Sequence, residues 1–99
     1  MTDWHLYLVR TGAGHLYAGV STDVERRFVE HCDGASRGSR YLRGRGPLEL
    51  VYSQRIGERG RALRAESRFK RLSKERKEEI VRSQPGAGEI LALLDLEDG

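Results

Sequence analysis

Two tyrosines and an arginine, Tyr7, Tyr17 and Arg27, follow one another at intervals of ten residues near the start of the chain. Each tyrosine lies in a short apolar run typical of a strand, and the arginine follows in a segment with a helical pattern. An ionised phenol can take a proton from water, and a guanidinium stays charged and binds phosphate oxygens. The three residues together point to chemistry on a phosphate ester.

His31 is a second candidate to accept a proton. Its reference pKa of about 6.5 suits that task better than the value of about 10 for tyrosine. The residues alone do not choose between Tyr7, Tyr17 and His31 as the base, and ordinary strand and helix packing is the alternative for all three. On a helical wheel His31 falls beside an apolar stripe and Arg27 at its flank, so we expect both near the sheet. The stripe consists of Val24, Phe28 and Cys32.

Glu66 is the carboxylate that we expect on the apolar face of a later helix, between Leu63 and Phe69 on the wheel. Glutamates are rarely buried unless they are paired or bind a metal. Lys70, one turn later, is the simpler partner, and spacing alone favours it. A magnesium ion is the alternative partner of Glu66. Such an ion often takes only one or two protein carboxylates and completes its coordination shell with water and substrate phosphate.

The elements that must position these residues begin with two strands, 4–9 and 15–20, joined through a turn at 11–14. Paired residues in a hairpin share a face of the sheet. Pairing of Tyr7 with Tyr17 across an odd-numbered loop puts both phenols on one face, whereas an even loop puts them on opposite faces.

The rest of the chain predicts a helix from the capping box at 22–25 to about residue 33, a third strand over 48–53, and two further helices. These helices cover 58–72 and about 74–82, the last capped by Ser73. The predicted order is β-β-α-β-α-α, in one domain over residues 1–84. The acidic tail, 85–99, carries an apolar run at 90–94 and is either a short docked helix or a frayed end.

Composition and charge fit a protein that binds a polyanion. One cysteine excludes an internal disulfide, and no signal peptide or membrane span is visible, which makes the cytoplasm the expected location. The net charge of +3 is unevenly spread, because residues 37–82 carry fifteen basic and six acidic groups. A merely solvated basic face is the alternative, but the clustering favours nucleic acid. The expected nucleic-acid contacts are Arg40, Tyr41, Arg43, Arg45, Lys70 and Arg71.

The order and spacing of several blocks resemble the GIY-YIG nuclease superfamily, most closely its small stand-alone bacterial members. The resemblance covers about residues 4–82. It is carried by Leu6-Tyr7, Tyr17-Ala18-Gly19, Thr22-Asp23-Val24-Glu25-Arg26-Arg27, His31, Arg43-Gly44-Arg45-Gly46-Pro47, Glu49-Leu50-Val51-Tyr52 and Ala65-Glu66-Ser67-Arg68-Phe69-Lys70-Arg71-Leu72.

The resemblance implies an α+β fold with a three-stranded antiparallel sheet flanked by helices. It also implies an endonuclease that cleaves nucleic acid, with DNA favoured over RNA, using one Mg²⁺ or Mn²⁺ ion. By position, Glu66 falls on the family's metal-binding glutamate and Arg27 on its catalytic arginine. Tyr7 and Tyr17 fall on the two motif tyrosines, and His31 on a nearby histidine or tyrosine position.

This chain also departs from the family pattern. His5-Leu6 replaces Gly-Ile in the first motif, Ala18 replaces isoleucine in the second, and Val20 stands where some members carry a lysine. Two alternatives to a nuclease therefore stay open. One is a nucleic-acid-binding module that has lost useful catalysis, and the other is a protein-interaction domain whose acidic tail folds over its basic loop.

Overall fold

The computed structural model describes residues 3–33 and 41–96. Three strands, β1 (Trp4–Arg10), β2 (Leu16–Ser21) and β3 (Glu49–Gly57), form an antiparallel sheet in the order β2-β1-β3. The helices in these ranges are α1 (Val24–Asp33), α2 (Arg59–Lys70), α3 (Lys74–Ser83) and α4 (Ala87–Leu93). The α+β class and the three-stranded sheet are confirmed, and α4 follows the predicted order of elements.

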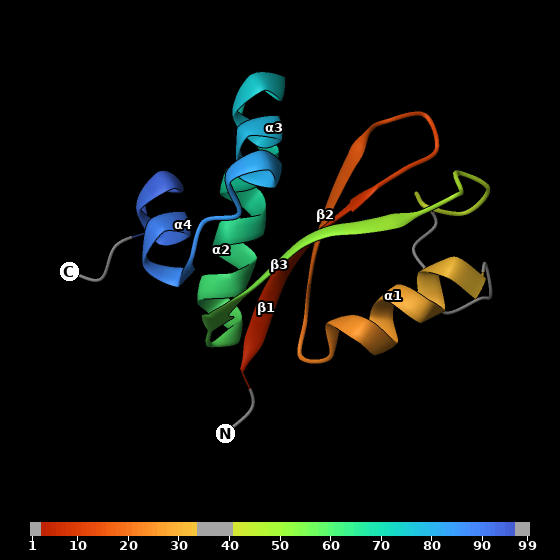
Figure 1. Cartoon of the computed structure of the whole chain (residues 1–99). Helices are drawn as coiled ribbons and strands as arrows, with labels where there is room; N and C mark the ends of the chain where they lie inside the picture. Colours follow the sequence, from red (N-terminus) through yellow and green to blue (C-terminus); the bar gives the residue numbers. More distant parts are fainter. Residues whose placement is uncertain (1–2, 34–40, 97–99) are drawn as a thin grey trace.

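The sheet separates α1 from the other three helices (Figure 1). Successive side chains of a strand point to opposite faces. Accordingly, Leu6 and Leu8 join the core beneath α2, α3 and α4, whereas Tyr7 and Val9 join a smaller cluster with Phe28 of α1. The alternation in β1 therefore assigns each residue to the face that the sequence predicted.

The observed register differs by two residues from the one that would pair Tyr7 with Tyr17. Tyr7 lies opposite Gly19, and Tyr17 lies opposite Val9. Arg10 pairs with Leu16, so residues 11–15 form an odd-numbered connection, as expected. A shift of two residues keeps every side chain on its face, so both phenols still lie on the α1 side of the sheet.

Helix α1 begins after Asp23, whose carboxylate accepts a hydrogen bond from the Arg26 backbone N–H at 3.1 Å. The predicted apolar stripe needs correction at its last position, because Cys32 is exposed and His31 is buried instead. The start of α3 is confirmed: Ser73 accepts a hydrogen bond from the Arg76 N–H at 3.2 Å. Strand β3 is longer than the predicted 48–53 and continues to Gly57.

Helix α4 docks on the main core. Ile90 and Leu94 are buried in the same cluster as Leu6 and Leu8. The Tyr52 hydroxyl of β3 donates a buried hydrogen bond to the Pro85 carbonyl at 2.7 Å, which fixes the chain just before α4. Of the two alternatives for the acidic tail, the structure has the docked helix. Within the described ranges, no helix combines the length and the apolar character needed to cross a membrane.

Candidate active site

A buried hydrogen bond joins the first motif tyrosine to α1. Tyr7 Oη lies 2.9 Å from His31 Nε2, and the two residues are 1% and 3% exposed. Strand β1 fixes the tyrosine, because it is the central strand and pairs on both sides. Helix α1 fixes the histidine, because the Asp23 cap sets where the helix starts and Phe28 packs on the same side of the sheet.

Gly19 makes room for the Tyr7 phenol. A Cβ atom added at Gly19 would lie 2.5 Å from Tyr7 Oη, so the ring passes directly over the glycine. Glycine inside a strand often marks a close approach of this kind. The role of Gly19 was not predicted from the sequence, although a glycine inside an apolar strand is a signal for such a contact.

Arg27 is held beside this pair on α1. Its guanidinium forms an ion pair with Glu30 at 3.0 Å, a partner that sequence reasoning did not identify. Burial alone would lower the pKa of Arg27, but the hydrogen bond to Glu30 and the nearby Tyr7 phenol raise it. The guanidinium therefore stays charged next to Tyr7.

The surroundings set the protonation of Tyr7 and His31. Burial is the main cause that raises the pKa of Tyr7 to about 12, with Tyr17 adding to the effect and Arg27 opposing it. Burial, and next the positive charge of Arg27, lower the pKa of His31. At neutral pH the site therefore holds a neutral phenol hydrogen-bonded to a neutral imidazole.

Tyr17 connects this buried pair to the molecular surface. Its ring lies edge-on to that of His31, with centroids 5.8 Å apart, and stacks on Tyr41 with centroids 5.6 Å apart and planes 19° apart. Tyr17 is only half-buried. The Arg45 guanidinium lies 4.5 Å from the centroid of the Tyr41 ring, a cation–π contact.

The segment that carries Tyr41 and Arg45 is tied to the hairpin between β1 and β2. The Gly12 N–H donates to the Arg45 carbonyl at 2.8 Å. A Cβ atom at Gly12 would lie 2.5 Å from the Gly46 carbonyl oxygen, so the two turns are in direct contact. Of the other predicted nucleic-acid contacts, Arg43, Lys70 and Arg71 are exposed, and Arg40 lies outside the described residues.

Glu66 lies on α2, at the margin of its buried face. That face consists of Ala62, Ala65 and Phe69, whereas Leu63 is 37% exposed, which corrects the wider apolar face expected from the wheel. The Glu66 side chain is 21% exposed, and its carboxylate lies 3.5 Å from Lys70 Nζ. The predicted ion pair is therefore present.

Glu66 also belongs to the electrostatic environment of Tyr7. Its charge is one of the causes that raise the pKa of that phenol. Helix α2 packs on β2, the edge strand, from the face opposite α1. Glu66 therefore acts on Tyr7 through its charge, from a helix on the other face of the sheet.

The described residues suit a metal that needs few protein ligands. In the ranges 3–33 and 41–96 no three His, Cys, Asp or Glu side chains gather to hold an ion. A closed zinc site, with four protein ligands, does not fit. A magnesium or manganese ion does fit, because Glu66 offers a partly exposed carboxylate and substrate phosphate and water can supply the other ligands.

Comparisons with known proteins identify the family of the chain. The sequence model of the GIY-YIG catalytic domain matches residues 3–79. The UPF0213 protein YhbQ of Escherichia coli strain K12 is 49% identical over 94 residues, which cover 95% of this chain and 92% of that protein. A YhbQ protein of Shigella boydii is 48% identical over the same shares.

A solved structure gives the same result for the fold. The solution NMR structure of a UPF0213 protein from Bacillus halodurans is 34% identical, with a TM-score of 0.54, and the match covers 96% of this chain and 99% of that one. The family match and these relatives span nearly the whole chain. The protein therefore belongs to the family of GIY-YIG catalytic domains.

Proposed function

We propose that this protein is a divalent-metal-dependent endonuclease that hydrolyses phosphodiester bonds in nucleic acid, with DNA favoured over RNA. The observation that carries the proposal is the buried Tyr7–His31 hydrogen bond at 2.9 Å with a charged Arg27 beside it. Tyr7 and His31 are buried and Arg27, at 34% side-chain exposure, is partly buried. Taking polar groups out of water costs stability that a hydrogen bond only offsets, which favours a catalytic reason for these three residues.

Each residue has a distinct role in this proposal. Arg27 neutralises charge that builds on the phosphoryl group, since its guanidinium stays charged at any working pH. Tyr7 orients His31, because its own phenol is buried and holds its proton up to about pH 12. Tyr17 acts as the base in its ionised form: the phenolate takes the proton of the attacking water and becomes a neutral phenol. It is suited to this because it lies beside His31 and keeps exposed surface.

Glu66 is the residue that would hold the metal ion. When bound, Mg²⁺ or Mn²⁺ would supply positive charge to the attacked phosphate and to the leaving oxygen. Glu66 would exchange its contact with Lys70 for the ion, and Lys70 would then be available to the substrate backbone.

The first test is cleavage by the purified protein of a panel of DNA and RNA structures with Mg²⁺ or Mn²⁺. We expect Glu66→Ala to abolish cleavage and to leave binding intact or tighter, because a negative charge has been removed. The matched control is Glu75→Ala, which removes an exposed glutamate from the first turn of α3 and should cut normally. Normal cleavage by Glu66→Ala would refute the metal role and leave Glu66 as the partner of Lys70.

The same assay tests Arg27. Arg27→Ala should lower the cleavage rate by at least ~10²-fold, the usual scale for one electrostatic contact in a transition state, with a smaller effect on binding. Arg26→Ala is the control, because Arg26 is the exposed neighbour on the same helix. If the wild-type protein binds nucleic acid but cuts none of the panel with either metal, the protein is a binding module and the proposal fails.

A further inference from the structure

Two hollows adjoin each other beside the site, between the β1–β2 hairpin and the helices α2 and α3. The first has a volume of about 350 Å³ and is lined by Tyr17 and Lys70 among others. The second has a volume of about 380 Å³ and reaches His15 and Lys74 near the tip of the hairpin. Leu16, Tyr41 and Lys77 line both. The two hollows therefore form one continuous groove, which we name the lysine groove.

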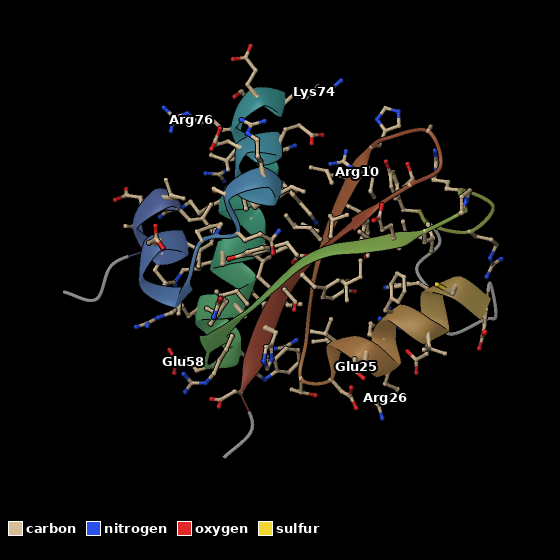
Figure 2. The ribbon with its side chains drawn as sticks, viewed as in Figure 1. Arg10, Glu25, Arg26, Glu58, Lys74 and Arg76 are labelled. Atoms are coloured by element: carbon tan, nitrogen blue, oxygen red, sulfur yellow. The ribbon has the colours of Figure 1, made fainter. Side chains whose placement is uncertain are left out.

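The lysine groove collects every lysine of the chain. Arginines outnumber lysines fifteen to three in the sequence, yet Lys70, Lys74 and Lys77 all line this groove. Figure 2 shows Lys74 and Arg76 extending from different sides of α3, with Lys74 on the side of the hairpin. Lys70 is paired with Glu66, whereas Lys74 and Lys77 add positive charge along the same track, which makes a surface that attracts an anionic chain.

The acidic residue in the groove is neutralised. Glu78 lines the second hollow, but both of its oxygens accept hydrogen bonds from Arg10, at 2.7 and 2.9 Å. This contact with Arg10 lowers the pKa of Glu78, so the pair stays ionised and its charges cancel. Lys77 lies with its Nζ 5.7 Å from the centroid of the Phe69 ring, and Lys74 is exposed. The groove keeps a net positive charge.

The inner end of the groove meets the candidate active site at Tyr17. Tyr17 lines the first hollow and also contacts His31, and its stacking partner Tyr41 is 42% exposed. Lysines along a track with an exposed aromatic ring are typical of surfaces that bind a single strand, with phosphates on the cations and a base on the ring. Hollows of a few hundred Å³ have the size of small-ligand sites, which suits the bases and phosphates of a single strand.

We infer that the lysine groove binds a single-stranded extension of the substrate that continues from the scissile phosphate. This inference rests on the proposed function and makes it more specific, because it selects nucleic acid with an unpaired segment next to the cut. Lys74 and Lys77 contact the phosphates of that segment. One of its bases takes the place of the Arg45 guanidinium on the Tyr41 ring, whose stacking on Tyr17 is kept.

The test measures binding by fluorescence anisotropy for a blunt DNA duplex and for the same duplex with a single-stranded extension. The wild-type protein should bind the extended DNA more tightly. The double variant Lys74→Gln/Lys77→Gln should lose about 10-fold in affinity for the extended DNA and little for the blunt one. Its log–log salt slope should become shallower by about 1.4, the value for two phosphates of a single strand.

The control is Arg76→Gln/Arg82→Gln, which removes the same charge from α3 outside the groove and should behave as wild type. The single variant Lys74→Gln, at an exposed position, should show about half the effect in log affinity and guards against a folding defect at Lys77. Equal affinities and slopes for the lysine and arginine double variants would overturn the inference while cleavage still supports the proposed function. Equal losses on blunt and extended DNA would overturn the single-strand assignment. A wild-type protein that binds neither DNA would overturn the proposed function itself.

Discussion

Tyr7 reaches His31 only because the neighbouring strand carries a glycine at the position opposite. The phenol passes over Gly19, at a distance that no Cβ atom tolerates. Glycine costs strand stability, so its place inside β2 is explained by this contact and not by any turn. The need for a glycine at position 19, in the second sequence motif, thus follows from the position of Tyr7, in the first.

Gly19→Ala should therefore displace Tyr7. We expect the free energy of unfolding to fall by about 1–3 kcal/mol, the usual effect of overpacking, and cleavage to fall with it. Gly88→Ala is the control, because a Cβ atom there meets nothing within 4 Å, and it should be neutral or slightly stabilising. Urea unfolding of both variants makes the comparison. A Gly19→Ala protein as stable and as active as wild type would contradict the close approach.

Alkaline pH offers a second measurement on single residues. The pKa of Tyr7 and that of Tyr52 are each raised by burial from 10.0 to about 12. Below pH 10 each phenol is protonated in the folded and unfolded states. Between about pH 10 and 12 the unfolded chain loses protons that the folded chain keeps, so stability falls as the pH rises.

Tyr7→Phe should reduce that fall by about one proton, or about 1.4 kcal/mol per pH unit. Tyr52→Phe should give a reduction of the same size. Urea unfolding at several pH values between 9 and 12 measures the slopes. The burial of Tyr7 would be disproved by a Tyr7→Phe protein that retains the wild-type slope.

The sequence predicted on which face of the sheet Tyr7 and Tyr17 lie, but not which residues they contact. Alternation fixes the face of a side chain, so Tyr7 and Tyr17 were expected on one side and are found there. Which residues pair between β1 and β2 depends on the number of residues in the turn that joins them. The alternation pattern does not give that number; it only relates an odd or an even number to the face of each tyrosine. The ion pair of Arg27 with Glu30 also escaped prediction, because nothing in the spacing distinguishes it from an ordinary exposed pair.

At the scale of elements, α4 is the clearest case in which the structure decides what the sequence left open. Its apolar run suggested either a docked helix or a frayed end, because seven residues carry too weak a period to decide. Tertiary contacts decide it: the core receives Ile90 and Leu94, and the Tyr52 hydroxyl holds Pro85. The start of the helix at 74–82 was predicted from its cap, Ser73, and the structure confirms it. For the helix at 22–33 the capping box at 22–25 predicted the right place, but the cap is Asp23 and not Thr22, so α1 begins at Val24.

Two neighbouring leucines test the docking of α4. Leu94 is 2% exposed and Leu93 is 49% exposed. Leu94→Ala should lower the free energy of unfolding by about 2–5 kcal/mol, since it removes buried methyl groups and leaves a cavity. Leu93→Ala should change it by less than about 1 kcal/mol. Equal effects in a thermal or urea unfolding experiment would show that α4 does not pack on the core as described.

At the scale of the whole molecule, the uneven charge is the property that sequence alone predicted most directly. The basic block over 37–82 supplies the loop with Arg43 and Arg45 and the helices α2 and α3. What the sequence did not predict is that the lysines share one groove, because that depends on how α2 and α3 stand against the hairpin.

Binding to nucleic acid should therefore weaken steeply with salt. Four to six phosphate contacts predict a log–log slope of about −3 to −5. Replacing Arg40, Arg43 and Arg45 by alanine should make the slope shallower by about 2 to 3, because each contact contributes about one unit. Fluorescence anisotropy over a range of salt concentrations measures both. A slope near zero for the wild-type protein, or no change in the triple variant, would contradict a phosphate-binding surface here.

The contact between Gly12 and the segment at Arg45 and Gly46 has a consequence for the products of cleavage. The N–H of Gly12 and its missing side chain hold that segment against the hairpin whose first strand carries Tyr7. In the proposed function, the segment expected to bind the substrate is thus held at a fixed position relative to the residue expected to act at the cut. The cut should then fall at a constant number of nucleotides from the one bound by this segment, whatever the base sequence. Only a change in the hairpin should move it.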